Sequence, residues 1–412
     1  MQGARNKNIV PASALGYAIS FLLLVGLFTS GVIFITSTHK RIEAHFVGQE
    51  YLLFDNYSAI LFGASVDGEG TYQVFHPSGD TSNITVKNWG MLRSTVVQTY
   101  NKQRQVKREA LTMQETDAVY PCLYMPDQKR KIALAGETRL EGKVYASERA
   151  LTRGNIHRKP LKADKLVYGK LYKSERYLPP LHPNITKAEI ANLLNDVSEI
   201  EVLPKDTSYS FGEKTSLFRR SEKMEIQEYL KGNLILQSFE EIFVRATARL
   251  EHVILLAPRV IFEKGFKGKV QVMATEHILC EESVQLDYPS ALMLYEKKPR
   301  GEQSRITLLE DARVLGGVLL TSENPDFRKP VFLEVLDATI GGLVYNQGES
   351  EVRGEIIGSL YTNKLVAHAG GGVYGGHLVD AVISTKQLPE RFLMPNWLKD
   401  SKVTKPILIT CT

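Results

Sequence analysis

The chain has little of the chemistry that holds metals, forms disulfides or supports nucleophilic catalysis. It contains three cysteines among 412 residues, Cys122, Cys280 and Cys411, and no CxxC pair. An odd, scattered set excludes a complete internal disulfide framework and a cysteine-based metal site. HExxH, GxSxG and P-loop motifs are absent as well. The cysteines are therefore expected to be isolated packed or surface thiols.

The chain also has little excess of one charge sign over the other. The formal net charge is +5, and Arg5 and Lys7 contribute two of these charges. The remainder is close to neutral, so composition gives no argument for nucleic acid. The nine histidines are dispersed along the chain. We predict no catalytic residues, no metal site, no cofactor and no nucleic-acid partner, and we expect that the protein is not an enzyme.

What the sequence does have is one long apolar run near its amino terminus. Residues 9–38 carry no charged side chain, and residues 15–35 read LGYAISFLLLVGLFTSGVIFI. A helix rises about 1.5 Å per residue, so ~20 apolar residues cross the hydrocarbon core of a bilayer. A signal peptide has a shorter apolar centre, and a buried core helix would show a polar stripe. We therefore predict an uncleaved membrane span at residues 9–38.

The charges that flank this run bear on its direction. Arg5 and Lys7 lie on one side, and Lys40 and Arg41 lie on the other. These pairs nearly balance under the positive-inside rule. A tail of eight residues before the run is easily kept in the cytoplasm. We therefore expect the large carboxy-terminal domain on the outer side of the membrane.

The helix is predicted to continue beyond the membrane surface. Apolar positions recur at steps of three and four, until Gly63 and the glycine-rich residues 67–70 end the helix. Residues 1–65 thus resemble the amino-terminal architecture of type IV pilins and pseudopilins. Phe21 stands where the processing motif of that family has glutamate, and an ordinary anchor with a stalk is the alternative. The stripe consists of Ile42, Phe46, Gln49, Leu53, Tyr57, Ile60 and Ala64.

Residues 66–130 are predicted to form a small α+β unit. Short strands at residues 71–75 and 83–86 surround a turn-rich segment. A helix is predicted to follow, and its apolar face consists of Trp89, Leu92, Val96 and Tyr100. Residues 102–108 then contain four cations. This run is either a solvated face or a site for an anionic headgroup or polymer.

From residue 131 a glycine-centred repeat begins, with the form apolar-x-Gly-x-apolar. Asp311 and Asp337 lead into the two most similar copies, 26 residues apart. The period of two in a strand places the apolar residues and the glycine on one face. Glycine gives room where backbone is crowded or turns a corner, and aspartate suits a turn. The copies are centred on Gly142, Gly268, Gly316, Gly342, Gly354 and Gly358.

Such copies bury their inner faces only against one another, so they predict a coil of parallel strands, a β-solenoid. We assign the solenoid to residues 131–388. Residues 159–232 are predicted to be an inserted loop and helix, with Thr186 at the start of that helix. Residues 389–412 are predicted to be a tail that caps the last rung.

The fold class is therefore mostly β, with a C-terminal parallel β-helix, a long N-terminal membrane helix and the small α+β unit. The alternation of Ile340, Gly342 and Val344 also predicts the direction of single side chains. Val344 is expected to point into the solenoid and Tyr345 to point out of it.

The repeat segments resemble a known class of protein. TRLEGKVY, RVLGGVLL, TIGGLVY and EVRGEIIGSLYTN resemble the bacterial polymer-forming β-helix proteins of the bactofilin type. The whole chain looks like a group of uncharacterised bacterial envelope proteins with one amino-terminal span and a carboxy-terminal β-solenoid. The copies are spaced less regularly than bactofilin rungs. The resemblance implies a single-pass protein of a bacterial inner membrane, with its C-terminal domain periplasmic or otherwise extracytoplasmic.

Two clusters leave room for chemistry. His368 and His377 flank the densest glycine stretch of the chain, which is either two tight corners of a rung or a nest of N–H groups that holds an anion. Glu310, Asp311 and Asp337 could meet on successive rungs, as acids of a polysaccharide lyase or as turn-forming residues.

The leading hypothesis is a membrane-anchored structural or assembly component of a bacterial cell envelope, associated with a pilus- or secretion-type machine. Its partners would be the bilayer, through residues 9–38, and other proteins or further copies of the chain. The alternative is a β-solenoid that binds or cleaves cell-wall or extracellular polysaccharide.

Overall fold

The computed structural model describes residues 12–66, 68–116, 120–182, 194–195, 197–203, 205–298, 302–389, 392–399 and 403–411. The helix predicted to start at Thr186 lies outside these residues. Contacts divide the chain into two compact units. The first contains Met1–Ala59, Gln73–Asn83 and Gln98–Lys107, and the second contains Ile60–Tyr72, Ile84–Val97 and Arg108–Thr412.

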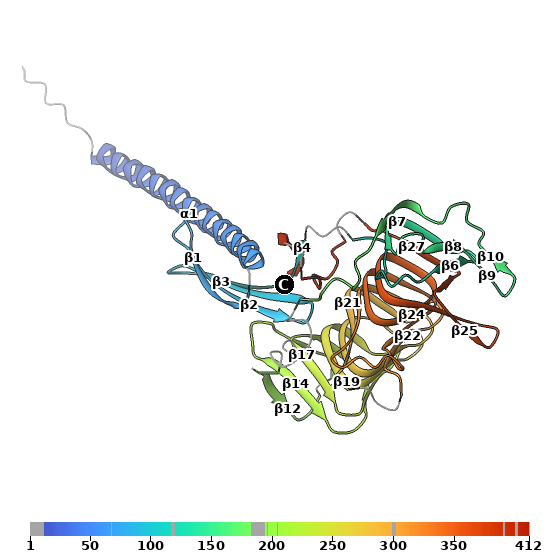
Figure 1. Ribbon diagram of the computed structural model, residues 1–412. Coiled ribbons are helices and arrows are strands. Elements are labelled where there is room, and N and C mark those ends of the chain that lie inside the picture. Colours follow the sequence, from blue (N-terminus) through green and yellow to red (C-terminus); the bar gives the residue numbers. More distant parts are fainter. Residues whose placement is uncertain are drawn as a thin grey trace, which may run out of the picture. The chain divides into compact units, whose positions relative to one another are not determined.

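Helix α1 (Ala12–Ser65) contains residues 12–38 of the apolar run and continues past it, as predicted (Figure 1). Side chains at positions 14–51 are exposed almost without exception. Within α1 an 18-residue window reaches a mean hydropathy of 2.5, and none of that window is buried. By length and composition α1 is a candidate single-pass membrane anchor.

The buried face of the second half of α1 differs from the predicted stripe. Ile60 and Ala64 are buried as expected, but Phe46 is 66% exposed and Tyr57 is 42% exposed. Asp55 is buried in their place, at 8% exposure. The pattern is misleading because polar side chains can be buried once partners satisfy their hydrogen bonds. The buried residues of this half are Leu52, Asp55, Asn56, Ala59, Ile60 and Ala64.

A five-stranded sheet follows the helix. The described residues from 68 to 116 contain no helix, so the predicted α+β character of this region is wrong. The residues of the predicted helical face lie on strands, where burial alternates along β3. Spacings of three and four among only four residues imitated a helix. The sheet has the order β1 (Gly70–Phe75), β2 (Thr81–Trp89), β3 (Leu92–Tyr100), β4 (Gln105–Thr116) and β28 (Val403–Cys411).

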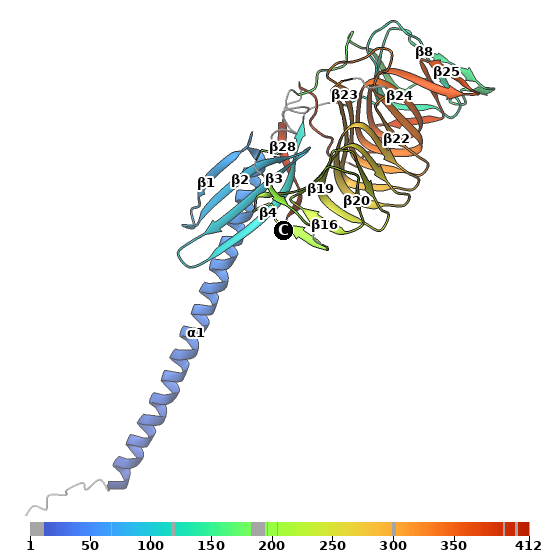
Figure 2. The same ribbon diagram turned by 90° about the horizontal axis from the view of Figure 1, so that it is seen from below.

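A larger system of parallel strands closes on itself. Figure 2 shows its strands side by side, from β19 and β20 to β24. Gly316 lies opposite Gly342, so the two most similar copies of the repeat are neighbours in register. The strands are β5 (Leu123–Tyr124), β7 (Arg139–Ala146), β11 (Tyr168–Lys173), β12 (Val197–Ile200), β13 (Thr207–Tyr209), β14 (Thr215–Arg220), β15 (Met224–Ile226), β16 (Tyr229–Gly232), β17 (Leu234–Ser238), β18 (Glu241–Val244), β19 (Arg249–Phe262), β20 (Lys267–Cys280), β21 (Gln285–Glu296), β22 (Arg305–Leu308), β23 (Arg313–Ser322), β24 (Phe332–Ala369) and β27 (Ala381–Ser384).

The strands in this sheet do not follow the order of the sequence. Leu123 of β5 pairs with Leu360 of β24, and Val144 of β7 pairs with both Leu123 and Leu171. Strands β5, β7 and β11 therefore lie beyond β24, which follows them in the chain. Residues 159–232, predicted to be an inserted loop and helix, contribute strands β11 to β16 to the sheet.

Short strands complete the fold. β25 (Gly372–Gly375) turns back on β24 as an antiparallel hairpin. A three-stranded sheet has the order β26 (His377–Val379), β6 (Ile132–Ala135) and β8 (Leu151–Arg153). A two-residue ladder joins β9 (Asn155–Ile156) to β10 (Lys159–Pro160).

A column of apolar side chains fills the inner side of the parallel sheet. Its members occupy equivalent positions on successive strands, so each covers the next. Burying one aliphatic side chain contributes about 1.5–3 kcal/mol, and none of these residues is more than 2% exposed. The column contains Phe218, Leu236, Leu255, Val272, Leu292, Val318, Val344, Leu360, Leu123 and Val144.

The repeat glycines lie where strands come too close for a side chain. Gly342 has φ +131°, and a Cβ added there would lie 2.0 Å from the carbonyl oxygen of Gly316. Gly358 repeats the geometry against Gly342. Asp311 and Asp337 adopt φ +57° and +52°. Asp311 lies in a turn, as predicted, whereas Asp337 lies within β24 at a position of left-handed backbone. Short polar side chains tolerate this left-handed conformation better than most.

The outer face of the same strands is covered. Val344 and Tyr345 point to opposite sides, as predicted. Val344 belongs to the apolar cluster on the inner side of the sheet, and Tyr345 belongs to the cluster on the outer side. Tyr345 is nevertheless only 2% exposed, and its hydroxyl donates to the carbonyl oxygen of Pro179 at 2.8 Å. The first part of the predicted capping tail lies on this face, since a Cβ on Gly317 would lie 2.4 Å from the indole of Trp397. The second part, β28, pairs with β4 in the five-stranded sheet. The stacked tyrosines of this face are Tyr345, Tyr361, Tyr124, Tyr145 and Tyr172.

Gly342→Ala should destabilise the protein by about 3 kcal/mol, because the methyl group would meet the backbone of the next strand and the residue would be strained. Gly375→Ala is the matched control, since a Cβ there would make only an ordinary 3.6 Å contact with Lys364. Urea unfolding of the detergent-solubilised chain measures both. Equal losses would contradict the assigned role of Gly342.

Val344→Asp and Tyr345→Asp should both cost several kcal/mol, because each places a carboxylate among buried apolar groups. Tyr345→Phe should cost about 1 kcal/mol, since it removes one hydrogen bond. Val373→Asp is the control, as Val373 is 65% exposed on β25. Denaturant midpoints compare the four variants. A near-neutral Tyr345→Asp would show that the outer face is open to water.

Candidate functional site

The densest polar cluster of the first unit joins α1 to the β1–β2 hairpin and to β3. Asp55 and Asn56 come from the buried face of α1, His76 lies in the hairpin, Ser82 lies on β2 and Thr99 lies on β3. Ser82 and Thr99 are fully buried. The site therefore gathers residues that are up to 44 positions apart in the sequence.

The polar side chains of this cluster form a continuous chain of contacts. His76 Nδ1 lies 3.4 Å from Asp55 Oδ1. His76 Nε2 shares a hydrogen bond with Ser82 Oγ at 2.8 Å. Ser82 Oγ shares another with Thr99 Oγ1 at 2.7 Å, and Thr99 Oγ1 accepts from Asn56 Nδ2 at 3.0 Å.

The order serine, histidine and aspartate is that of a hydrolytic triad, but the geometry does not fit catalysis. Ser82 has no exposed surface, and a nucleophile must be reached by its substrate. The side chains of His76 and Asp55 are 7% and 11% exposed. Removing one partner from such a network leaves a buried polar group unsatisfied, at about 1–3 kcal/mol. The cluster therefore fastens the hairpin to the helix.

Sequence reasoning missed this cluster, although a signal was present. Asp55 and Asn56 interrupt the apolar pattern of α1 at positions next to buried Leu52 and Ala59. Polar residues on an otherwise buried helical face are the feature to look for. Their partners could not be found in the sequence, because they lie on strands after a turn.

The cationic run at residues 102–108 lies in the turn between β3 and β4 and at the start of β4. Arg104 is half-buried and is held against α1. Its Nη1 donates to the carbonyl oxygen of His45 in α1 at 2.8 Å, and its backbone N–H donates to Asn101 Oδ1 at 3.0 Å. Arg104 therefore holds a fixed position in the first unit.

The glycine-rich stretch between His368 and His377 contains the β24–β25 hairpin, so the prediction of two rung corners is wrong there. Gly370 and Gly371 adopt φ +54° and +80°, as a tight two-residue turn requires. His368 donates its backbone N–H to Glu351 at 3.1 Å, and its ring Nδ1 contacts the same carboxylate.

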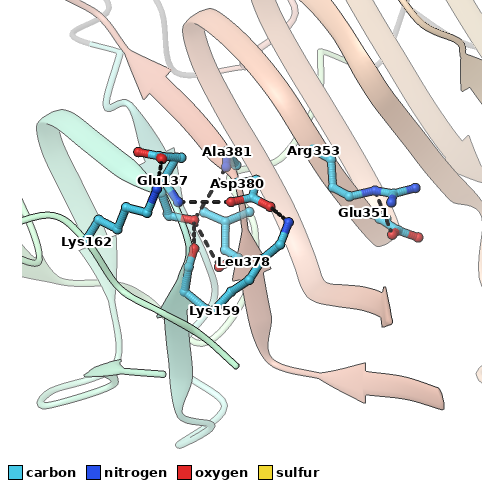
Figure 3. Close-up of polar contacts among 10 residues, drawn as sticks. Glu137, Lys159, Lys162, Glu351, Arg353, Leu378, Asp380 and Ala381 are labelled. Carbon is cyan, nitrogen blue, oxygen red and sulfur yellow. Dashed lines mark hydrogen bonds and ion pairs between the residues drawn. The ribbon is translucent and has the colours of Figure 1, made fainter. Parts of the chain in front are cut away.

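The Glu351 carboxylate is almost fully buried and also lies 3.5 Å from Nε of Arg353 (Figure 3). His377 Nδ1 lies 2.8 Å from the carbonyl oxygen of Gly375. The two histidines thus make local contacts on either side of the hairpin. The Nδ1 atom of each ring already has a protein partner.

Asp380 is the centre of a second charged cluster (Figure 3). It accepts from Lys159 Nζ at 2.7 Å and from the backbone N–H of Glu137 at 3.0 Å. Burial disfavours ionisation, but these bonds outweigh it and lower the pKa of Asp380. Lys162 pairs with the side chain of Glu137. The cluster ties the β9–β10 segment to the corner before β27.

Of the acids considered for a lyase, Glu310 and Asp311 lie in a turn and Asp337 lies within β24. Asp311 donates its backbone N–H to the carbonyl oxygen of Asp337 at 3.0 Å, so these two corners are stacked. Asp311 is exposed. Groups of three or more His, Cys, Asp or Glu that could hold a metal are absent from the described residues.

Burial shifts several titratable groups away from reactivity. It raises the pKa of the Cys122 thiol to about 12 and raises that of Cys280. Both are free buried thiols, which confirms the expectation of isolated packed cysteines for these two. Burial also lowers the pKa of His252 to about 4 and lowers that of His277.

One segment of the second unit is strongly basic. Residues 129–176 contain 14 lysines and arginines against five aspartates and glutamates, whereas the whole chain has 51 against 46. These cationic side chains are exposed. The near-neutral charge of the whole chain therefore hides one basic segment. The absence of a nucleic-acid partner was argued from the charge of the whole chain, and it stays a prediction.

Comparisons with known proteins add little to this geometry. No family model matches the sequence, and no curated protein matches it. Among solved structures, the competence-associated pilin ComZ from Thermus thermophilus is similar over 83% of this chain and 86% of its own. The sequence identity is 12% and the TM-score is 0.27. A likeness this distant assigns no function to the chain.

His252 should make stability depend on pH. The pKa of His252 in the folded protein, about 4, lies below the ordinary value of 6.5. The folded state therefore keeps its full stability above pH 6.5 and loses stability as the pH falls towards 4, because only the unfolded chain takes up the proton readily. The full loss is about 3 kcal/mol. His252→Asn removes the group and tolerates the positive φ of this position, +62°. Urea unfolding at pH 7 and pH 4.5 should therefore show a smaller loss in the variant, and equal losses would refute the assignment.

Proposed function

We propose that this protein is a membrane-anchored structural or assembly component of a bacterial cell envelope. The observation that carries the proposal is the division of α1. Its first part is uncharged and exposed along its length, whereas Asp55 and Asn56 in its second part are buried in the hydrogen-bonded cluster. A helix of this kind holds a folded domain at a membrane surface.

The domain so held is, in this proposal, a β-solenoid. Its support is the parallel register, in which Leu292 pairs with Val318 and Val318 pairs with Val344. Residues at one position of the repeat are therefore neighbours on successive strands. A stack of this type offers a long surface for partners.

The basic segment at residues 129–176 supports binding of an acidic protein partner or an acidic face of a second copy. Exposed charge of one sign favours encounter with a partner of the opposite sign. The place beside a pilus- or secretion-type machine rests on the pilin-like start of the sequence. The single pass rests on the one long apolar run, and the extracytoplasmic C-terminal domain rests on the tail of eight residues that precedes the run.

The anchor is tested by fractionation of cells that express the full chain. The protein should stay in the membrane after carbonate extraction, and protease added to spheroplasts should digest its large domain. Leu22→Lys with Val25→Lys should release it into the soluble fraction, because two charges in the span are costly. A soluble wild-type protein with a new amino terminus near Ser37 would overturn the anchor.

Assembly is tested by mild cross-linking in the same cells. We expect wild-type protein in a species larger than the monomer, and Lys170→Glu with Lys173→Glu should reduce it several-fold. Lys267→Glu with Lys386→Glu changes the same charge at exposed positions outside the basic segment and should not. A clean monomer, together with depolymerisation of a glycan from those cells, would favour the enzyme alternative.

A further inference from the structure

The first unit has a polar hollow at the end of β3 and the turn that follows. The hollow is shallow and open to solvent, and its volume is about 530 Å³. Ligand pockets are usually lined by apolar side chains, but this one is lined by amides, one tyrosine and one arginine. The lining residues are Asn83, Gln98, Tyr100, Asn101, Gln103, Arg104 and Gln105.

The amides form pairs across neighbouring strands. Gln98 Nε2 donates to Gln105 Oε1, and Gln73 Nε2 donates to Asn83 Oδ1, each at 3.2 Å. Each bond uses one donor and one acceptor, and an amide has two of each. Within the described residues, no other protein group satisfies the amide nitrogen of Gln105 or the amide oxygen of Gln98. The paired amides therefore present donors and acceptors side by side to solvent.

Arg104 supplies one fixed positive charge at this hollow. Its bond to the carbonyl oxygen of His45 uses one N–H group, and a guanidinium has five. No aspartate or glutamate lines the hollow. The Asp80 carboxylate nearby is only 5% exposed and accepts from Asn101 Nδ2 at 3.0 Å. An anionic group on a ligand would therefore meet a cation without competition from a lining acid.

This chemistry fits a sugar better than other ligand classes. Vicinal hydroxyls donate and accept at once, as the paired amides do, and the ring of Tyr100 can cover an apolar C–H face. The lining has no aliphatic side chain, which disfavours lipid. A single cation disfavours a phosphodiester polymer, which takes a row of cations. A carboxylate on the sugar would suit Arg104, since the two groups can bond through two parallel hydrogen bonds.

We propose that this hollow binds an oligosaccharide that contains a uronic acid, with the carboxylate on Arg104 and the hydroxyls on Gln98 and Gln105. The site does not depend on the assembly role, because its residues belong to the first unit and the basic segment lies in the second.

The test is calorimetric titration of the full chain in nanodiscs, because sugar-based detergents would compete. The probes are trigalacturonic acid and the neutral trimer galactotriose. The acidic trimer should bind saturably at one site and at least ten-fold more tightly than the neutral one. Arg104→Gln should remove that difference, and Arg104→Lys should keep part of it. Gln98→Ala with Gln105→Ala should weaken both trimers by at least ten-fold.

Arg176→Gln and Gln237→Ala are the matched controls, at positions outside the hollow, and should leave both affinities unchanged. Unchanged melting temperatures establish that each variant is folded. Three outcomes would overturn the proposal: no saturable binding of either trimer, equal affinities that Arg104→Gln does not alter, or the same loss in Arg176→Gln as in Arg104→Gln.

Discussion

The close approach of parallel strands is the constraint on which the rest of the second unit depends. Each inner side chain, such as Val318 or Val344, is buried only because equivalent residues lie on the strands before and after it. The same approach places the carbonyl oxygen of Gly316 where a side chain on residue 342 would be. The short distance between neighbouring strands thus accounts both for glycine at the repeat centre and for aspartate at the corner.

Covering the outer face is a separate matter from building the inner column. Apolar residues such as Met273 and Leu319 point away from the column and are buried under other parts of the second unit. Trp89 donates its indole N–H to the carbonyl oxygen of His252 at 2.9 Å, and Gln271 donates to the carbonyl oxygen of Trp89 at 2.8 Å. These bonds satisfy buried backbone groups where the β2–β3 turn meets the parallel sheet.

In the first unit, a polar network takes the place of an apolar core. The chain of hydrogen bonds from Asn56 to His76 satisfies groups that would be costly to bury alone. It also explains why Asp55 lies on the buried face of α1 while Tyr57 faces solvent. The hydrogen bonds of this cluster join the β1–β2 hairpin and β3 to α1.

The sequence alone determined the features that follow from local periodicity. The length of the apolar run and its helical continuation, the glycine-centred repeat, and the opposite directions of Val344 and Tyr345 are all set by neighbours along the chain. The candidate site could not be predicted from the sequence, because the partners of Asp55 and the amides around Arg104 come from different strands.

Only the tertiary structure decided which faces are covered and which strands are neighbours. Tyr345 is buried because residues near position 179 pass over it, and β5 lies beside β24 although about 240 residues separate them. Such contacts depend on the path of the whole chain, and no local pattern encodes that path. An alternating pattern tells which side chains share a face, but burial of that face is a property of whatever segment comes to lie on it.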